Sequence, residues 1–138
     1  MTTPSMGPVE HPAIAHCARY LDAVARADAL DAFVDPDMTF DELPNKVTPR
    51  GASSDLTAMR AGAERGKKVM RSQTYQVQRA FAAGPDIVVL EVLWIGVLAV
   101  AYGTLAAGDA MRAHCAMVFE LRAGRILRQR NYDCYEPF

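Results

Sequence analysis

The clearest pattern in the chain is the spacing of polar and apolar side chains in its second half. Residues 72–83 alternate between the two kinds, as a half-buried strand does. Three further segments, 87–100, 111–121 and 126–135, are rich in apolar and β-branched residues and are separated by stretches that contain glycine. Short connections of this kind favour antiparallel neighbours. The second half therefore predicts four consecutive antiparallel strands.

The first half of the chain carries apolar residues at helical spacing instead. Pro12 is suited to the first turn of a helix. The apolar positions that follow it form one stripe, which comprises Ile14, Cys17, Ala18, Leu21, Val24 and Ala25. Because such a stripe must be buried against another element, we expect this helix to cover one face of the sheet.

Shorter elements are expected between this helix and the four strands. Residues 28–33 favour a second, short helix, which the segment around Pro36 would end. Residues 38–43 favour a short strand, and Ser53 or Ser54 would cap a third helix. The sequence thus predicts the α+β fold class, with a cone-shaped, curved and mostly antiparallel sheet wrapped by about three N-terminal helices. The mouth of such a cone is a natural ligand site.

Length and composition narrow the possibilities further. The 138 residues fit one domain, expected over 12–138, behind a flexible N-terminal arm at 1–11. Apolar residues make up 51% of the chain, enough for a core of its own. A net charge of -1 gives no reason to expect nucleic acid or a membrane as partner. The N-terminus has no secretory pattern, and Cys17, Cys115 and Cys134 have no paired spacing, which favours a reduced, cytoplasmic protein.

Several short motifs in the second half carry a family resemblance. They are Gly103-Thr104-Leu105, Val118-Phe119-Glu120-Leu121, Gly124-Arg125-Ile126 and Arg130-Asn131-Tyr132. With the order of the elements, they resemble the nuclear-transport-factor-2-like superfamily, in particular its SnoaL-like and ketosteroid-isomerase-like branch. SnoaL-like proteins often show a similar Gly-Lys/Arg-Ile followed by Arg-Asp-Tyr. The resemblance covers about residues 12–136, and it implies a fold that hosts enzymes, binding proteins and assembly modules alike.

Alternation along the strands predicts which side chains face the cavity. Placing the charged Glu120 outward directs the alternate residues of its strand inward, namely Ala113, Cys115, Met117 and Phe119. Limonene epoxide hydrolase, in the same superfamily, carries a catalytic Asp in its Arg-Asp-Tyr motif. The resemblance places Asn131 at that Asp, so Asn131 and Asp133 would face the cavity. Trp94 is expected at its mouth.

Three residues are candidates for proton chemistry. Tyr20, within Arg19-Tyr20, resembles the tyrosine of ketosteroid isomerase that donates to an oxyanion, although a core tyrosine is the alternative. Glu42 lies at or next to that isomerase's catalytic Asp, and the strand register leaves Asp41 and Glu42 both open. A carboxylate in an apolar cavity has a raised pKa and can carry a proton. Asp133 could take the role of base that Asn131 cannot fill. The alternatives are a solvated edge carboxylate and a hydrogen-bonded residue at a strand end.

Taken together, these residues predict a pocket for a small apolar molecule. The expected activity is that of a cofactor-independent isomerase, dehydratase or cyclase, with Tyr20, Glu42 and Asp133 as the catalytic candidates. The expected substrate-binding residues are Trp94, Cys115, Met117, Phe119 and Asn131. The isomerase's second oxyanion donor falls at Met117, which cannot donate, and this argues against steroid isomerisation itself.

The sequence gives no sign of a cofactor or a metal. It has no glycine-rich loop of the kind that cradles phosphates, and the spacing of its histidines does not suggest a metal site. The alternative to an enzyme is a non-catalytic ligand-binding or dimerisation module. Segments 87–100 and 111–121 have more apolar positions than one covered face can hide, so a homodimer is expected, with Val118 and Val100 helping to bury the outer face.

Overall fold

The computed structural model describes residues 11–138, and across them the chain forms two helices and six strands. The helices are α1 (Pro12–Ala25) and α2 (Leu56–Val69). The strands are β1 (Val34–Glu42), β2 (Ala52–Asp55), β3 (Met70–Ala83), β4 (Ile87–Leu98), β5 (Ala110–Arg122) and β6 (Arg125–Tyr135). They form one sheet in the order β2-β1-β6-β5-β4-β3. β1 and β6 pair in parallel, and the other neighbours pair antiparallel.

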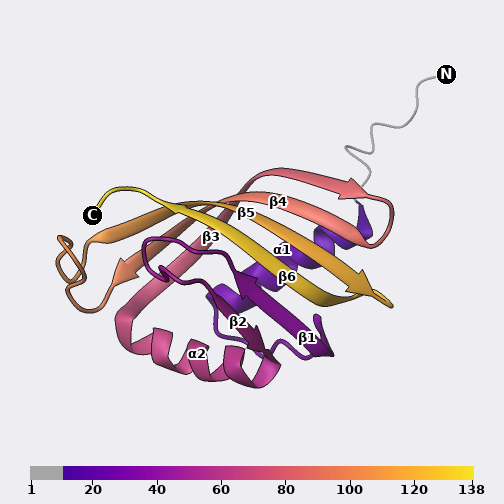
Figure 1. Ribbon diagram of the computed structural model, residues 1–138, viewed down its shortest axis with the longest axis horizontal. Helices are drawn as coiled ribbons and strands as arrows, with labels where there is room; N and C mark the ends of the chain where they lie inside the picture. The colour runs from indigo at the N-terminus through magenta and orange to yellow at the C-terminus, as the bar shows by residue number, and fades with distance from the viewer. Residues whose placement is uncertain (1–10) are drawn as a thin grey trace.

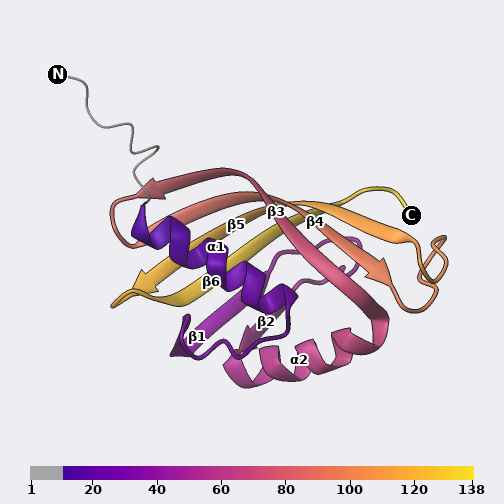
Figure 2. The same ribbon diagram turned by 180° about the vertical axis from the view of Figure 1, so that it is seen from behind.

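The sheet is curved, and one helix crosses its face while the other lies along its edges (Figure 1). Helix α1 crosses one face of the sheet, as Figure 2 shows from behind, and packs against β3 and β4. Helix α2 contacts β1 and β2 at one edge of the sheet and β3 at the opposite edge. The fold class predicted from the sequence is therefore confirmed, with two helices in place of about three.

The core lies between α1 and the inner face of the sheet. From α1, Cys17, Tyr20 and Leu21 are each at most 2% exposed. They pack in one cluster with inward residues of the strands, among them Leu90 and Phe119. Burying a large apolar side chain contributes roughly 1.5–3 kcal/mol. Of the predicted stripe only Cys17 and Leu21 are buried, the other four residues are half-buried, and Tyr20 and neighbouring alanines complete the buried face.

The prediction of a second short helix over 28–33 is wrong. These residues form turns, in which the amides of Phe33 and Val34 both donate to the carbonyl of Leu30. One carbonyl that receives two donors closes a single turn and does not continue as a helix. The local preference for a helix is overridden because the chain must enter the sheet at Val34.

Strand β1 begins four residues earlier than the sequence predicts and contains Pro36, which was expected to be a break. The register between β1 and β6 shifts between Val34 and Thr39, so Pro36 lies in an irregular part of the strand. Proline cannot donate to a ladder hydrogen bond and is tolerated at such bulges. The side chain of Asp35 accepts from the amide of Asp37 at 2.8 Å across this irregularity.

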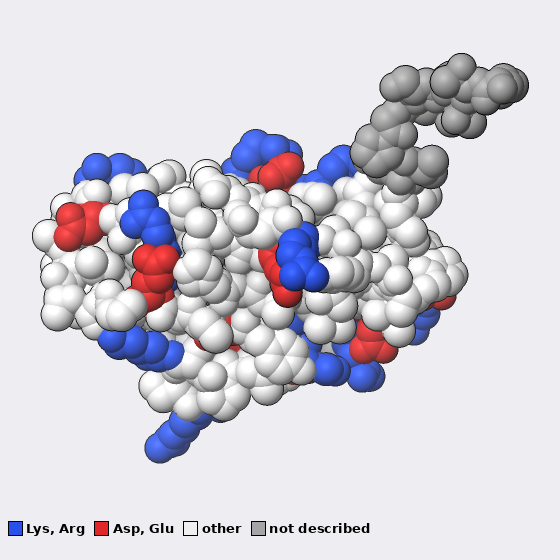
Figure 3. All heavy atoms as spheres, turned by 90° about the horizontal axis from the view of Figure 1, so that it is seen from above, with Lys and Arg blue, Asp and Glu red and all other residues white. Residues whose placement is uncertain are grey.

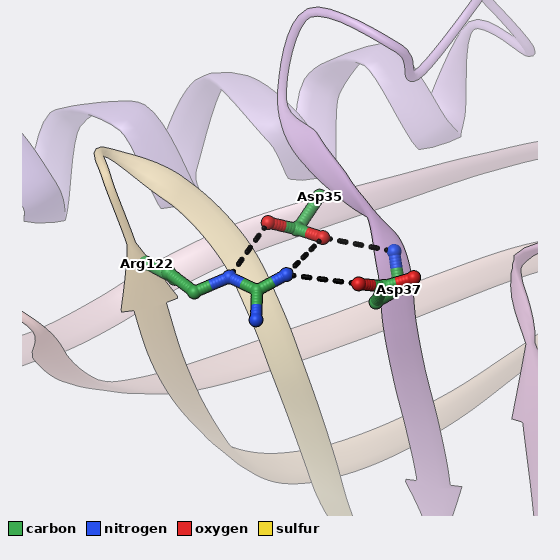
Figure 4. Close-up of polar contacts among 3 residues, drawn as sticks. All are labelled: Asp35, Asp37 and Arg122. Atoms are coloured by element: carbon green, nitrogen blue, oxygen red, sulfur yellow. Dashed lines mark hydrogen bonds and ion pairs between the residues drawn. The ribbon is translucent and has the colours of Figure 1, made fainter.

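An arginine at the end of β5 holds the same irregular segment. Arg122 Nε and Nη2 donate to Asp35 Oδ2 and Oδ1 at 3.1 and 2.9 Å, and Nη2 also reaches Asp37 Oδ2 at 3.0 Å (Figure 4). The Arg122 hydrogen bond and the Asp37 amide hold the pKa of Asp35 below its usual value. This contact joins β1 to β5, which are separated by β6 in the sheet.

Helix α2, in contrast to β1, starts later than predicted. Ser53 and Ser54, the expected caps, belong to β2, where they pair with β1. Asp55 caps the helix instead, because its Oδ1 accepts from the amide of Ala58 at 2.8 Å. Ser53 donates to Asp41 Oδ1 at 2.6 Å, which holds Asp41 beside β2.

Two sequence expectations concern the surface and the N-terminus. The predicted arm lies outside the described residues except for His11, which stands at the N-cap of α1. Neither described helix has the length and apolar character needed to cross a membrane. The face seen in Figure 3 carries acidic and basic side chains that are scattered and largely beside each other, with uncharged surface between them.

Candidate active site

The inner face of the sheet holds a cavity of about 200 Å³. Its wall comes from five strands and comprises Phe40 and Glu42 of β1, Gln73 and Tyr75 of β3, Trp94 of β4, Ala113, Cys115 and Met117 of β5, and Asn131, Asp133 and Tyr135 of β6. Most of these residues alternate along their strands, which is why they share one face. The wall combines aromatic and aliphatic side chains with polar ones such as Gln73 and Asn131, and its ionisable carboxyls are Glu42 and Asp133.

Strand register brings the polar residues of the wall together. Asn131 pairs with Met117 on β5 and with Glu42 on β1, so these three residues form a row across the sheet. Asp133 lies one pleat further along β6 and pairs with Cys115. The structure thus places Glu42 in the cavity, while the alternative, Asp41, lies outside it and accepts from a β2 serine.

Asp133 combines burial with an unmet hydrogen bond. Its Oδ1 is buried and has no hydrogen-bond partner among residues 11–138. Burial raises the pKa of Asp133 above its usual value, and the Cys115 thiol and the Asn131 amide oppose that rise. A buried acceptor left unsatisfied typically costs about 1–3 kcal/mol. A donor on a ligand, or a transferred proton, would relieve this cost.

Glu42 is the second carboxyl of the cavity. Burial raises its pKa, the hydrogen bond from Thr48 opposes the rise, and the charge of Asp133 adds to it. Thr48 Oγ1 lies 3.2 Å from Glu42 Oε2 and holds the carboxyl from the loop that follows β1. An ionised Asp133 thus makes ionisation of Glu42 less favourable.

The remaining polar groups of the wall stay protonated. Burial, together with the nearby carboxyls, raises the pKa of Tyr75 and of Tyr135, so both phenols keep their protons and remain donors. Burial and the charge of Asp133 likewise raise the pKa of the Cys115 thiol. A neutral thiol is a poor nucleophile, so Cys115 lines the cavity and can donate only a weak hydrogen bond.

Trp94 forms the aromatic side of the cavity. Its Nε1 donates to Gln73 Oε1 at 2.9 Å, and its ring meets the Tyr135 ring edge-on at 6.2 Å between centroids. Gly96 makes room for it, because a Cβ at that position would lie 2.5 Å from the Trp94 ring and 2.8 Å from the Met70 sulfur. This glycine is required by close packing rather than by its backbone conformation.

Two expected cavity residues lie in the core instead. Tyr20 and Phe119 are 1% and 0% exposed, and neither belongs to the wall of the cavity described above. Their rings meet edge-on at 6.1 Å. The Tyr20 hydroxyl donates to Gln129 Oε1 at 2.8 Å, so it is satisfied within the protein. Both residues are absent from the cavity wall because α1 packs on the inner face of the sheet beyond Met117, where core side chains fill the space.

The other expected positions agree with the sequence analysis. Trp94, Cys115, Met117 and Asn131 lie in the wall, as do Glu42 and Asp133. Their roles in binding and catalysis stay predictions. Within residues 11–138 there is no group of three or more His, Cys, Asp or Glu side chains placed to hold a metal ion.

The sequence analysis did not name several residues of the site and its surroundings, among them Gln73, Tyr75, Gln129 and Thr48. The first two lie on β3, where alternation could have assigned them to the inner face. Gln129 shares the inward parity of Asn131 and Asp133, but nothing in the sequence indicated that it bonds to both Tyr20 and Asn131. Thr48 lies in a loop, where no periodicity applies.

Comparisons with known proteins show which family and which solved structures this chain is similar to. A model of the SnoaL-like domain matches residues 17–129. Among curated proteins, no significant match was found.

Many solved structures are similar to this chain. IdmH, a candidate polyketide cyclase from Streptomyces antibioticus, has a TM-score of 0.73 at 18% identity and covers 90% of this chain and 92% of its own. A candidate polyketide cyclase from Xanthomonas campestris pv. campestris has a TM-score of 0.72 at 23% identity, with 91% and 90% covered. An epoxide hydrolase of M. tuberculosis, similar to limonene epoxide hydrolase, has a TM-score of 0.68 at 17% identity, with 94% and 86% covered. At these identities the likeness shows the fold alone.

Proposed function

The chain belongs to the SnoaL-like domain family of the nuclear-transport-factor-2-like superfamily, and on that premise we propose that it is a cofactor-independent enzyme working by proton transfer. Its substrate is a small, mostly apolar molecule, and its reaction is an isomerisation, a dehydration or a cyclisation. The observation that carries the proposal is a carboxyl in the wall of the cavity, Asp133, whose buried Oδ1 has no hydrogen-bond partner among residues 11–138. The similar structures support an enzymatic role, because they include candidate cyclases and an epoxide hydrolase.

Asp133 is the base of the proposed reaction. Its raised pKa brings it closer to neutral pH, where a general base is most effective. In the proposed step the Asp133 carboxylate takes a proton from a carbon next to a carbonyl group. The electron pair of the C–H bond moves into the enolate, whose oxygen carries the negative charge.

Glu42 completes the proton transfer. Burial raises its pKa, and in its neutral form it can give a proton to the enolate at a second carbon or to a leaving hydroxyl. Asn131 lies between the two carboxyls in the strand register and is placed to hold the oxygen of the substrate. Trp94 and Met117 provide the apolar surface for the ring or chain of the molecule.

The test is exchange of protons for deuterium in small ketones. The protein is incubated in heavy water with cyclohexenone and with tetralone, and deuterium uptake beside the carbonyl is followed by proton NMR. We expect the wild type to exceed the buffer rate, and Asp133→Asn to lose on the order of 100- to 10,000-fold. Glu42→Gln tests the second carboxyl in the same assay, and Glu120→Gln, on the outer face of the sheet, is the matched control.

The alternative function is a non-catalytic ligand-binding module. Ketones that bind, detected by quenching of the single tryptophan, but that exchange no faster with wild type than with Asp133→Asn would favour this alternative and contradict the enzyme.

We also propose that the protein forms a homodimer through the outer face of the sheet. Phe81, Val89 and Val118 pair in one row across β3, β4 and β5 on the face opposite the cavity. Phe81 is 44% exposed, and the exposed Tyr132 lies on the same face. Val100 is exposed in the loop after β4. Apolar rows of this kind are typical of self-complementary two-fold interfaces.

A further inference from the structure

A chain of hydrogen bonds runs from the first helix to the cavity. Tyr20 of α1 donates its hydroxyl proton to Gln129 Oε1 at 2.8 Å. Gln129 Nε2 then donates to Asn131 Oδ1 at 3.0 Å. The three side chains are 1%, 5% and 7% exposed, so water does not compete for these bonds. Tyr20 and Gln129 lie outside the wall of the cavity described above, whereas Asn131 is part of it.

Each bond in this chain fixes the orientation of the next amide. A side-chain amide has a carbonyl oxygen that accepts and an amino group that donates. Because Tyr20 occupies the oxygen of Gln129, the amino group of Gln129 is directed to Asn131. The oxygen of Asn131 is occupied in turn, so its amino group, Nδ2, has two N–H groups to offer: one interacts with Asp133, whose pKa it lowers, and the other is left for the cavity. Reversing one amide alone would put two donors or two acceptors against each other, and the direction of the whole chain is set by Tyr20 acting as the donor.

We propose that Tyr20 and Gln129 are positioning residues, which hold Asn131 with Nδ2 toward the cavity and so make it a hydrogen-bond donor to an oxygen of the substrate. The orientation of the Asn131 amide follows from the hydrogen bonds alone, whereas its role toward a substrate rests on the proposed function. That role narrows the substrate class to molecules with a carbonyl or hydroxyl oxygen next to the carbon that gives its proton to Asp133.

The chemistry of the site favours this arrangement. When Asp133 removes a proton from the carbon beside a carbonyl, negative charge develops on the carbonyl oxygen. A donor that already points at that oxygen stabilises the charge without having to reorient. The isomerase resemblance suggested Tyr20 as this donor. The structure assigns the contact to Asn131, with Tyr20 two hydrogen bonds away.

The state of Asp133 reports the orientation of Asn131 directly. The Asn131 amide is one of the groups that hold down the pKa of Asp133, which burial raises. The other titratable groups that face this site are Glu42 on β1, Tyr75 on β3, Cys115 on β5 and Tyr135 on β6. Tyr20→Phe and Gln129→Met change none of these four groups, so a change in the pKa of Asp133 in these variants can be traced to Asn131.

The experiment compares Tyr20→Phe and Gln129→Met with the double variant. Carboxyl NMR, titrated with pH, gives the pKa of Asp133 in each folded protein. We expect both single changes to free the Asn131 amide and to raise the pKa of Asp133 further. Because Tyr20 acts through Gln129, adding Tyr20→Phe to Gln129→Met should cause no additional rise. Phe119→Leu, which loosens the packing around Tyr20 without touching the hydrogen bonds, should leave this pKa unchanged.

A second readout uses ketone exchange. Loss of one oxyanion donor costs on the order of 100- to 1000-fold in kcat, so freeing its orientation should cost roughly tenfold or more, with little change in KM. An unchanged Asp133 titration in both folded single variants would overturn the proposal. So would a rise that adds fully in the double variant. A shifted titration in a protein that exchanges no ketone would support the positioning role while contradicting the proposed reaction, so the two failures can be told apart.

Discussion

Replacing Asp133 with Asn separates a carboxyl held for chemistry from one held for structure. In the folded protein burial raises the pKa of Asp133, and its Oδ1 has no partner among the described residues. The fold therefore disfavours the ionised carboxylate at neutral pH. Asn keeps the shape and carries no charge, so we expect Asp133→Asn to be more stable than the wild type near neutral pH and to be inactive.

The size of the gain follows from the environment of the carboxyl. A buried acceptor without a partner costs about 1–3 kcal/mol and more when it is charged, so the ionised Asp133 is disfavoured relative to a neutral Asn, and because the residue is only partly buried we take this difference as about 1 kcal/mol. For a domain of this size such a gain raises Tm by roughly 4 °C. The gain depends on pH. A group whose folded pKa is raised contributes stability that is fully present below its unfolded pKa and is lost as pH rises through the folded pKa.

The assay is thermal unfolding of both proteins across the range from about pH 3.5 to about pH 8.5, which spans the ordinary Asp pKa. The two Tm curves should coincide at the acid end and separate as the pH rises, with the variant above the wild type. Glu120→Gln, on the outer face, should show no such separation. A variant that is less stable at every pH would show that the Asp133 carboxylate is a structural hydrogen-bond acceptor, and the reasoning would then be wrong.

Three other predictions follow from the packing. Gly96→Ala should destabilise the fold by roughly 1–3 kcal/mol and shift the fluorescence of Trp94, because the added methyl collides with its ring; unchanged emission and Tm would contradict this. Arg122→Met should lower Tm above the ordinary pKa of Asp35, and the deficit should shrink as pH falls through the lowered folded pKa; a deficit that grows in acid would contradict the assignment. Sedimentation at micromolar protein should give twice the chain mass of 15.1 kDa, and Val118→Glu should give a monomer; a monomeric wild type would remove the dimer.

The sequence predicted the parts of the site that depend on strand alternation. Placing Glu120 outward was enough to put Cys115 and Met117 in the wall, and the resemblance of Asn131 to a catalytic Asp put Asn131 and Asp133 there. It could not show where the cavity ends along a strand. Phe119 has the same parity as Met117 but lies under α1, and the position of a helix over a sheet is set by tertiary packing.

Other features depended on contacts between segments that are far apart in the chain. The bond from Tyr20 to Gln129 joins residues 109 positions apart, and no local pattern encodes it. The bond from Thr48 to Glu42 comes from a loop without periodicity. The short helix expected over 28–33 failed for a related reason, because local preference gives way where the chain has to enter the sheet.

The most direct test of the proposed proton-transfer site is a crystal structure of the protein soaked with cyclohexenone. We predict the ring against Trp94 and Met117, the carbonyl oxygen within hydrogen-bond distance of Asn131 Nδ2, and the carbon beside the carbonyl facing the Asp133 carboxylate. A ketone bound in the cavity with its oxygen turned away from Asn131, or bound only outside the cavity, would contradict it.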